Sequence, residues 1–143
     1  MKANAQITIK GLQLNSKNSD VMELVTEGSY YSKNGSFYII YKESDVTGMD
    51  GTTTTIKAKD SVVTLTRHGG VNNQFVFNKS EKQQSYYETP YGSFVMNVFS
   101  RKVDIDLSEE GGGLNIIYSL DINGQLSSDN NINLSVRTIA TQN

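Results

Sequence analysis

The sequence predicts an all-β protein that folds as a single antiparallel, closed β-barrel of about eight to ten strands. Apolar and polar residues alternate with a period of two along most of the chain, and no long stretch has apolar residues at helical spacing. The 143 residues include 12 Gly, 8 Tyr and 1 Pro, a composition that favours strands and turns. Residues 1–143 have the usual size of one domain. Closure is favoured over a sandwich because it removes exposed strand edges.

Strands are expected wherever the alternation is regular, and neighbouring segments can merge into one long bent strand. In chain order these segments are Gln6–Leu14, Val21–Tyr31, Ser36–Glu43, Thr52–Lys59, Ser61–Arg67, Asn73–Asn78, Gln83–Tyr87, Ser93–Ser100, Lys102–Leu107, Leu114–Ile122 and Asn131–Arg137.

Turn signals separate the predicted strands at the spacing of antiparallel hairpins. Asn34-Gly35 and Asn123-Gly124 are the sharpest, because a type I′ turn needs positive φ at both central residues. Ser127–Asn131 predicts a further turn, and the glycines of Ser108–Gly113 (SEEGGG) predict a mobile bend. The local connections between strands favour an up-and-down barrel.

Charge and cysteine content exclude several classes of function. The 13 basic and 15 acidic residues are interspersed and give a net charge of −2, so we expect neither a nucleic acid nor a membrane as partner. The chain has no cysteine, which excludes disulfides and thiolate chemistry and agrees with a reducing compartment. Its start, MKANAQITIKGLQL, lacks the apolar segment of a signal peptide. A cytoplasmic location is therefore expected.

Four stretches resemble a known family: GSYYSKNGSFYIIYKES, GTTTTIKAKDSVVTLTRHG, YETPYGSFVMNVFSRKV and GGGLNIIYSLDINGQ. Their order and separation are similar to those of the YwiB-like family of uncharacterised bacterial β-barrel proteins, from about Gln6 to Val136. The resemblance implies a calycin-like barrel, related in architecture to lipocalins and avidins, within a domain of unknown function. It implies no activity and no catalytic residues.

The strand VVTLTRHGG (Val62–Gly70) contains the best functional clue. Arg67 shares its parity with Val63 and Leu65, so it is expected to point into the barrel with them. By the same rule Tyr41 leads to Glu43 at a strand end. Tyr87 leads into the Thr89–Gly92 turn, which contains Tyr91. These five residues, Arg67, Glu43, Tyr41, Tyr87 and Tyr91, form the predicted ligand-binding set at the interior or mouth of the barrel.

Two interpretations of Arg67 remain open at this stage. As a ligand anchor it would hold a carboxylate, phosphate or other polar group while aromatic faces pack on an apolar body. As a structural plug it would bond to the protein's own acceptors, because an unpaired buried charge is costly. The first interpretation predicts a small-molecule binding module, and the second a barrel that acts through its outer surface on a protein partner or as a homodimer. Glu43 has a simpler alternative as a solvated loop residue.

The remaining polar features predict no chemistry. His68, the single histidine, has the opposite parity to Arg67 and is expected to be exposed. The acidic residues Asp104 and Asp106 alternate with Val103, Ile105 and Leu107, as on a strand with a solvated outer face. The threonine tract Thr52–Thr55 is expected to be ordinary strand surface. No catalytic residue, metal ligand or cofactor is predicted, and the chain is not expected to be an enzyme.

Overall fold

The computed structural model describes residues 4–14, 19–47, 49–70, 72–89 and 92–139 of the chain. In these residues β-strands follow one another with one short 3-10 helix, η1, between β3 and β4. The elements are β1 (Ala5–Leu14), β2 (Ser19–Lys33), β3 (Ser36–Lys42), η1 (Asp45–Thr47), β4 (Thr52–Lys59), β5 (Val62–Gly69), β6 (Asn72–Asn78), β7 (Lys82–Thr89), β8 (Gly92–Ser108), β9 (Gly111–Ile122) and β10 (Gln125–Thr138). No helix of the described residues is long and apolar enough to cross a bilayer.

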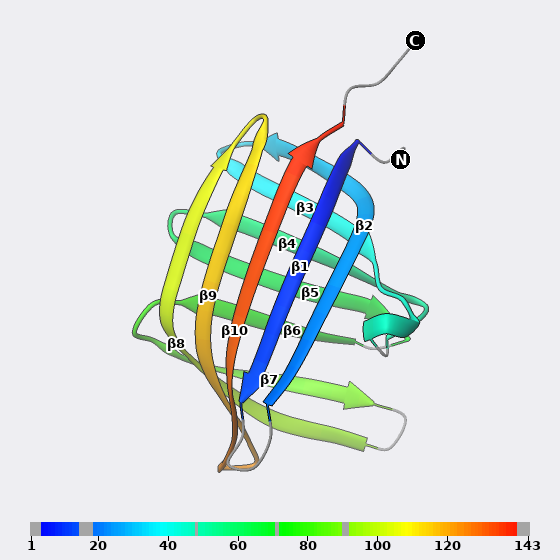
Figure 1. Cartoon of the computed structure of the whole chain (residues 1–143). Helices are drawn as coiled ribbons and strands as arrows, with labels where there is room; N and C mark the ends of the chain where they lie inside the picture. Colours follow the sequence, from blue (N-terminus) through cyan, green and yellow to red (C-terminus); the bar gives the residue numbers. More distant parts are fainter. Residues whose placement is uncertain (1–3, 15–18, 48, 71, 90–91, 140–143) are drawn as a thin grey trace.

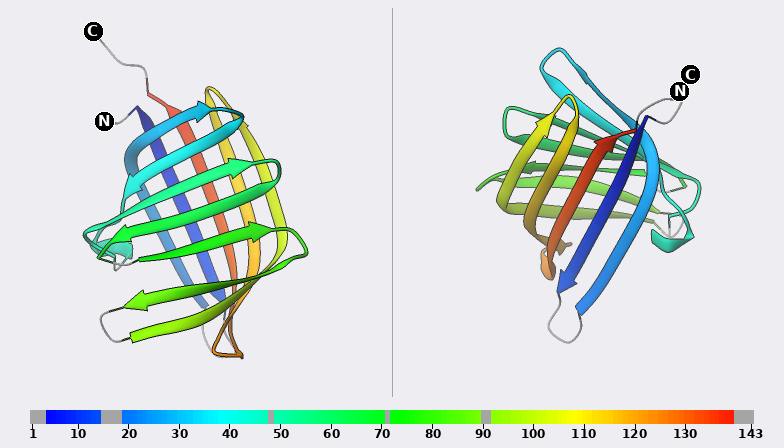
Figure 2. Two further views of the ribbon diagram at one scale, coloured as in Figure 1. Left: turned by 180° about the vertical axis from the view of Figure 1, so that it is seen from behind. Right: turned by 45° about the horizontal axis from the view of Figure 1, so that its top comes forward.

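The strands form an antiparallel meander that closes where β1 pairs with β10. One wall holds β1, β9 and β10, and the other holds β3 to β7, whose strands cross those of the first wall (Figures 1 and 2). Two long strands, β2 and β8, belong to both walls. The β2 strand pairs with β1 through Ser19–Gly28 and then with β3 through Ser29–Lys33. The predicted closed, up-and-down barrel is therefore confirmed, and both chain ends lie at the same end of it (Figure 1).

The two sharpest predicted turns have the expected backbone. Asn34 and Gly35 have φ of 53° and 80°, and Asn123 and Gly124 have φ of 53° and 85°. Positive φ at both central residues matches the right-handed twist of the flanking strands. The turn at Asp60 and Ser61 has the same signature, with φ of 51° and 70°, although it lacks the Asn-Gly sequence.

The predicted segments Ser93–Ser100 and Lys102–Leu107 are one strand, β8, with a bulge between Ser100 and Lys102. Before the bulge Met96 and Val98 are buried, and after it Val103 and Ile105 are the partly buried residues. The extra residue, Arg101, therefore resets the alternation and keeps apolar side chains inside as the strand bends between the walls.

One turn prediction was wrong and another was too long. The β10 strand starts at Gln125, so Ser127–Asn131 lies in the strand. Gly111–Gly113 also belongs to a strand, β9, and pairs with both β8 and β10. A Cβ at position 112 would approach the Asp106 carbonyl oxygen to 1.9 Å, so the absence of a side chain permits the close approach of β8 and β9.

The core is formed by inward-facing residues of all walls, and its largest fully buried apolar side chains are Phe77, Ile7, Ile39, Val63 and Val98. The Phe77 ring lies 4.8 Å from the Tyr118 ring and 6.1 Å from the Phe75 ring, measured between centroids. These rings belong to the core, or pack against it in the case of Tyr118.

Replacing Gly28 with Ala should destabilise the bend of β2. A Cβ at this position would meet the Ile40 carbonyl oxygen at 2.2 Å and Ile7 Cδ1 at 2.6 Å, so the strands must move apart at a cost of roughly 1–3 kcal/mol. Urea unfolding measures this cost. The matched control is Gly11→Ala, whose Cβ would meet Met22 Cε at an ordinary 3.6 Å. Equal stability of the two variants would contradict the packing described at the bend.

The buried Tyr30 hydroxyl predicts a loss of stability at alkaline pH. Tyr30 donates a hydrogen bond to the Ser108 carbonyl oxygen at 2.5 Å, and burial raises its pKa from 10.0 to about 12. Above pH 10 the unfolded chain releases this proton and the folded chain retains it, so the stability from this group is lost as pH rises towards 12. Tyr30→Phe should cost about 1 kcal/mol at neutral pH and should flatten the alkaline decline. Identical declines in urea titrations of both proteins would refute this.

Candidate binding site at the barrel mouth

Arg67 lies on the inward face of β5, as its parity predicts. Its side chain is only 19% exposed, and its guanidinium carbon lies 5.7 Å from the centroid of the Phe75 ring. The register explains this contact, because Arg67 pairs with Asn73 on β6 and Leu65 pairs with Phe75. Because the alternation of β5 continues to Arg67 near its end, the strand places a permanently charged guanidinium inside the barrel, among apolar side chains.

Glu43 is the counterion of Arg67 and is almost completely buried. Its side chain is 1% exposed, and Oε2 lies 3.9 Å from Arg67 Nε. The Glu43 amide donates to the Thr52 carbonyl oxygen at 2.8 Å, which continues the β3–β4 pairing past the end of β3. The interpretation of Glu43 as a solvated loop residue is therefore wrong, and its parity with Tyr41 places it inside.

Tyr41 and Thr54 complete a polar row across three strands. Tyr41 of β3 pairs with Thr54 of β4, which pairs with Arg67 of β5. The Thr54 hydroxyl donates to Glu43 Oε2 at 2.5 Å. Burial, and then the Glu43 carboxylate, raise the pKa of Tyr41, while Arg67 acts in the opposite direction. Tyr41 thus stays a neutral hydroxyl beside the ion pair.

The threonine tract was wrongly expected to be strand surface throughout. Thr52 and Thr54 are 1% and 0% exposed, whereas Thr53 and Thr55 are partly exposed. Alternation along β4 therefore gives the interior two hydroxyl groups. The Thr54 hydroxyl stabilises the buried Glu43 carboxylate by a hydrogen bond. The apolar–polar pattern of β4 alone could not reveal this role.

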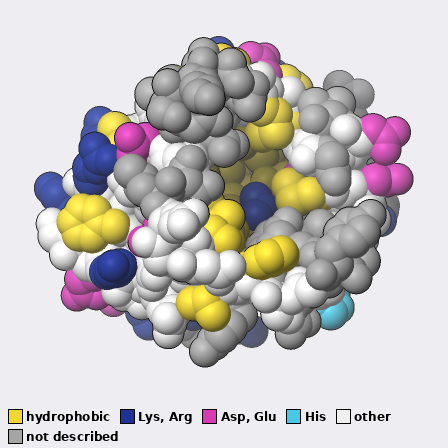
Figure 3. All heavy atoms as spheres, turned by 90° about the horizontal axis from the view of Figure 1, so that it is seen from below, with side chains coloured by type: hydrophobic (Ala, Val, Ile, Leu, Met, Phe, Trp, Pro, Cys, Tyr) yellow, Lys and Arg dark blue, Asp and Glu magenta, His cyan; other side chains and the backbone are white. Residues whose placement is uncertain are grey.

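Three adjoining cavities meet at Arg67. Their volumes are about 70, 240 and 440 Å³, and Arg67 lines each of them. The smallest also contacts Glu43 and Tyr41. The largest is lined by Arg67, Phe75, Phe94, Met96, Tyr118, Leu120, Ile122 and Asn130. Seen from the end away from the termini, the molecule is hollowed, and a basic side chain lies in the hollow among hydrophobic ones (Figure 3).

The sequence reasoning missed Tyr118 and Asn130, which line the cavities, and Asn73, which lies beside Arg67 on β6. Asn73 is 7% exposed, and neither Nδ2 nor Oδ1 has a hydrogen-bond partner among the described residues. Its signal was present, because Asn73 shares its parity with Phe75 and Phe77 on β6. Tyr118 lines the two larger cavities, and burial raises its pKa while Arg67 acts to lower it. Tyr118 and Asn130 are register partners across β9 and β10.

The structure brings together three of the five predicted residues: Arg67, Glu43 and Tyr41. Tyr87 pairs by backbone register with Asn73 and Phe94, but its side chain lies outside the described part of the chain. Tyr91 lies outside the described residues altogether.

His68 and the acidic residues of β8, for which no chemistry was predicted, lie on the outer surface. His68 is exposed, as expected from its parity. Asp104 and Asp106 are exposed on β8, and Lys102 pairs with Asp104 at 3.3 Å. In the described residues, no group of three or more His, Cys, Asp or Glu side chains is arranged to hold a metal ion.

Comparisons with known proteins agree with this barrel. The family model described as a domain of unknown function, DUF1934, matches residues 7–134. The chain is 29% identical over 126 residues to the uncharacterized beta-barrel protein YwiB of Bacillus subtilis (strain 168), covering 85% of this chain and 86% of that protein. The crystal structure of the ywiB protein from Bacillus subtilis superposes with a TM-score of 0.85 at 21% identity, covering 96% of this chain and 93% of that one. The predicted family resemblance is confirmed: the chain belongs to the DUF1934 family of unknown function.

Proposed function

We propose that this protein is a non-enzymatic, cytoplasmic binding module that holds a small, partly apolar molecule in the hollow at the barrel mouth. Arg67 is the charged anchor, Glu43 and Tyr41 orient it, and the apolar residues of the largest cavity contact the body of the ligand. The observation that carries the proposal is the position of Arg67 at the junction of three cavities, only 19% exposed. A cavity of about 440 Å³ is within the range of small-molecule sites.

The electrostatics of the site support binding rather than catalysis. Glu43 already accepts the Thr54 hydroxyl and faces Arg67, so it is poorly placed to accept a substrate proton. Tyr41 is held neutral by its environment. His68, the single histidine of the sequence, is exposed on the other parity. The polar groups at the mouth are therefore suited to recognise a ligand group, with no paired base and nucleophile among them.

The alternative is a barrel that acts through its outer surface on a second copy or another protein. In its favour, Val21 and Val25 on the outer face of β2 are 76% and 53% exposed. That interpretation, however, treats Arg67 as a plug bonded to the protein's own acceptors. The Arg67 Nε atom is buried and has no hydrogen-bond partner among the described residues, and the Arg67 side chain lines a cavity of about 440 Å³. Ligand binding is therefore the better explanation.

Native mass spectrometry of freshly purified protein, compared with its denatured mass, tests the proposed function. We expect an adduct that is lost on denaturation and whose mass corresponds to one bound molecule per chain. A clean mass equal to a whole number of chains would favour the outer-surface alternative.

Variants at the ion pair separate binding from folding. Arg67→Met should remove the adduct and also destabilise the fold by roughly 1–3 kcal/mol, because it leaves the Glu43 carboxylate buried without its counterion. The double variant Glu43→Gln with Arg67→Met should recover most of that stability in urea unfolding and still lack the adduct.

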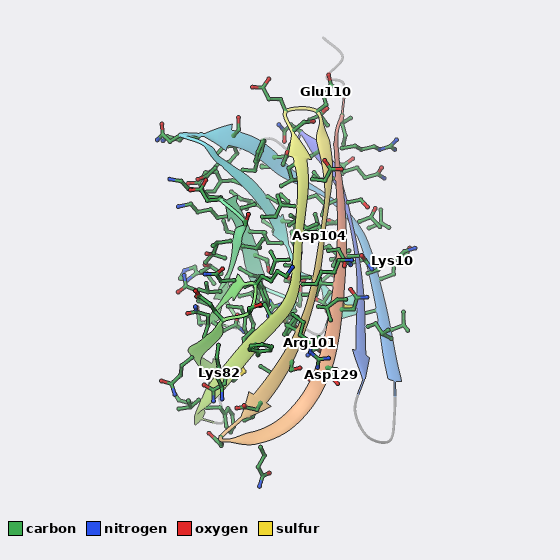
Figure 4. The ribbon with its side chains drawn as sticks, turned by 90° about the vertical axis from the view of Figure 1, so that its left-hand side faces the viewer. Lys10, Lys82, Arg101, Asp104, Glu110 and Asp129 are labelled. Atoms are coloured by element: carbon green, nitrogen blue, oxygen red, sulfur yellow. The ribbon has the colours of Figure 1, made fainter. Side chains whose placement is uncertain are left out.

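The matched control for this experiment is Arg101→Gln. It removes the same charge from the outer surface, where Arg101 pairs with Asp129 at 2.6 Å (Figure 4). This control should keep the adduct. An adduct that persists in the folded double variant would overturn the role of Arg67 as anchor.

A further inference from the structure

The buried carboxamide of Asn73 is the most unusual polar group in the described interior. The residue is 7% exposed, and its donor Nδ2 and its acceptor Oδ1 both lack a hydrogen-bond partner among the residues that the structure describes. Buried side-chain amides in native proteins are nearly always paired, because each unmade hydrogen bond costs desolvation energy. Asn73 lines none of the three cavities itself, but its unpaired Nδ2 and Oδ1 atoms belong to the register partner of Arg67, which lines all three.

Asn73 is also the immediate neighbour of the charged anchor. It is the register partner of Arg67 across β5 and β6, and Phe75 follows it on the same inward face. Both Arg67 and Phe75 line the largest cavity. Partners in an antiparallel pair have their Cβ atoms about 5 Å apart, so one compact group can touch both side chains.

The combined hydrogen-bonding pattern selects a particular chemistry. A guanidinium presents parallel N–H donors that match the two oxygens of a carboxylate. The Oδ1 atom of a free carboxamide can accept from the N–H of a secondary amide, whose carbonyl oxygen points the opposite way because the amide is trans. A simple carboxylic acid satisfies Arg67 and leaves the Asn73 acceptor unpaired, whereas an acid with an adjacent secondary amide satisfies both.

We propose that the ligand is an amido acid: a carboxylate next to a secondary amide, with an apolar chain on the acyl side. The carboxylate binds Arg67, the amide binds Asn73, and the apolar chain lies along Phe94, Met96 and Ile122 in the largest cavity. N-acylated amino acids and the carboxyl ends of short apolar peptides share this chemistry. The inference rests on the proposed binding function and specifies the ligand class for that same site.

Isothermal titration calorimetry with chain-matched probes tests the inference. N-octanoylglycine has both groups, undecanoate replaces the amide with methylenes, and N-octanoylethanolamine keeps the amide but lacks the carboxylate. We expect N-octanoylglycine to bind about tenfold or more tightly than either of the others, since each loses one or two hydrogen bonds in a buried site. Acetyl-leucyl-leucyl-glycine distinguishes the two sources: tighter binding than N-octanoylglycine identifies a peptide end, and weaker binding an acyl amino acid.

Substitutions should remove the two preferences separately. Asn73→Leu should abolish the preference for N-octanoylglycine over undecanoate while leaving undecanoate binding unchanged. Arg67→Met, in the Glu43→Gln background, should abolish the preference over N-octanoylethanolamine. The matched controls are Gln74→Leu, on the exposed face of β6, and Arg101→Gln, and both should keep the wild-type selectivity.

Thermal unfolding gives a readout that a purely structural role of Asn73 would not produce. Asn73→Leu should leave the melting temperature of the ligand-free protein unchanged or raise it, because it removes two unpaired buried groups. A structural residue would lower it. If the larger Leu side chain prevents folding, Asn73→Ala provides the same comparison.

The outcomes separate the inference from the proposed function. Equal binding of N-octanoylglycine and undecanoate, both lost in the Arg67→Met double variant, would overturn the amido-acid inference and leave an anion-binding module. An unchanged probe selectivity in Asn73→Leu would do the same. Failure of every probe to bind wild-type protein, together with a native mass free of adducts, would overturn both.

Discussion

Closure of the meander brings the inward-facing residue of each strand against the inward-facing residues of both neighbouring strands, and the interior depends on this constraint. Because side chains alternate with a period of two, register fixes which residues meet. Tyr41, Thr54, Arg67 and Asn73 lie in one row across β3, β4, β5 and β6 only because each pairing keeps the same inward parity. A one-residue slip of β5 against both of its neighbours would place Arg67 on the outer surface and turn His68 inward. The charged interior and the apolar core therefore have the same cause.

The buried polar groups of the interior differ in whether they have hydrogen-bond partners. Tyr30 donates to the Ser108 carbonyl oxygen, and Thr54 donates to Glu43. In the described residues, by contrast, the buried atoms without a hydrogen-bond partner are Arg67 Nε, both polar atoms of the Asn73 amide and Ser100 Oγ, which lies on β8 opposite Tyr118. Three of these four atoms belong to Arg67, which lines the largest cavity, and to its register partner Asn73.

The barrel, its hairpin order and the inward direction of Arg67 could be predicted because they depend on local rules. Alternation identifies the strands, and Asn-Gly pairs identify the two tightest turns. The burial of Glu43 and Thr54 depends instead on pairing across strands, which one strand's pattern does not contain. Asn73 could have been found by applying to β6 the parity rule used for β5. The bulge at Arg101 leaves a partial signal, the change of parity between Val98 and Val103, but only the pairing with β9 shows that both sides belong to one strand.

Whether Arg67 is a structural plug or a ligand anchor depends on how closely its guanidinium is paired with the Glu43 carboxylate. Glu43 balances the charge of Arg67, so the pair can be buried without the full cost of an isolated ion. The two groups are nevertheless 3.9 Å apart, and the carboxylate takes its short hydrogen bond from Thr54 instead. A plug would place the guanidinium in close contact with its acceptor, since that contact is what compensates for desolvation. Here the carboxylate accepts from Thr54 and Arg67 lines all three cavities, which is the arrangement that the proposed anchor requires.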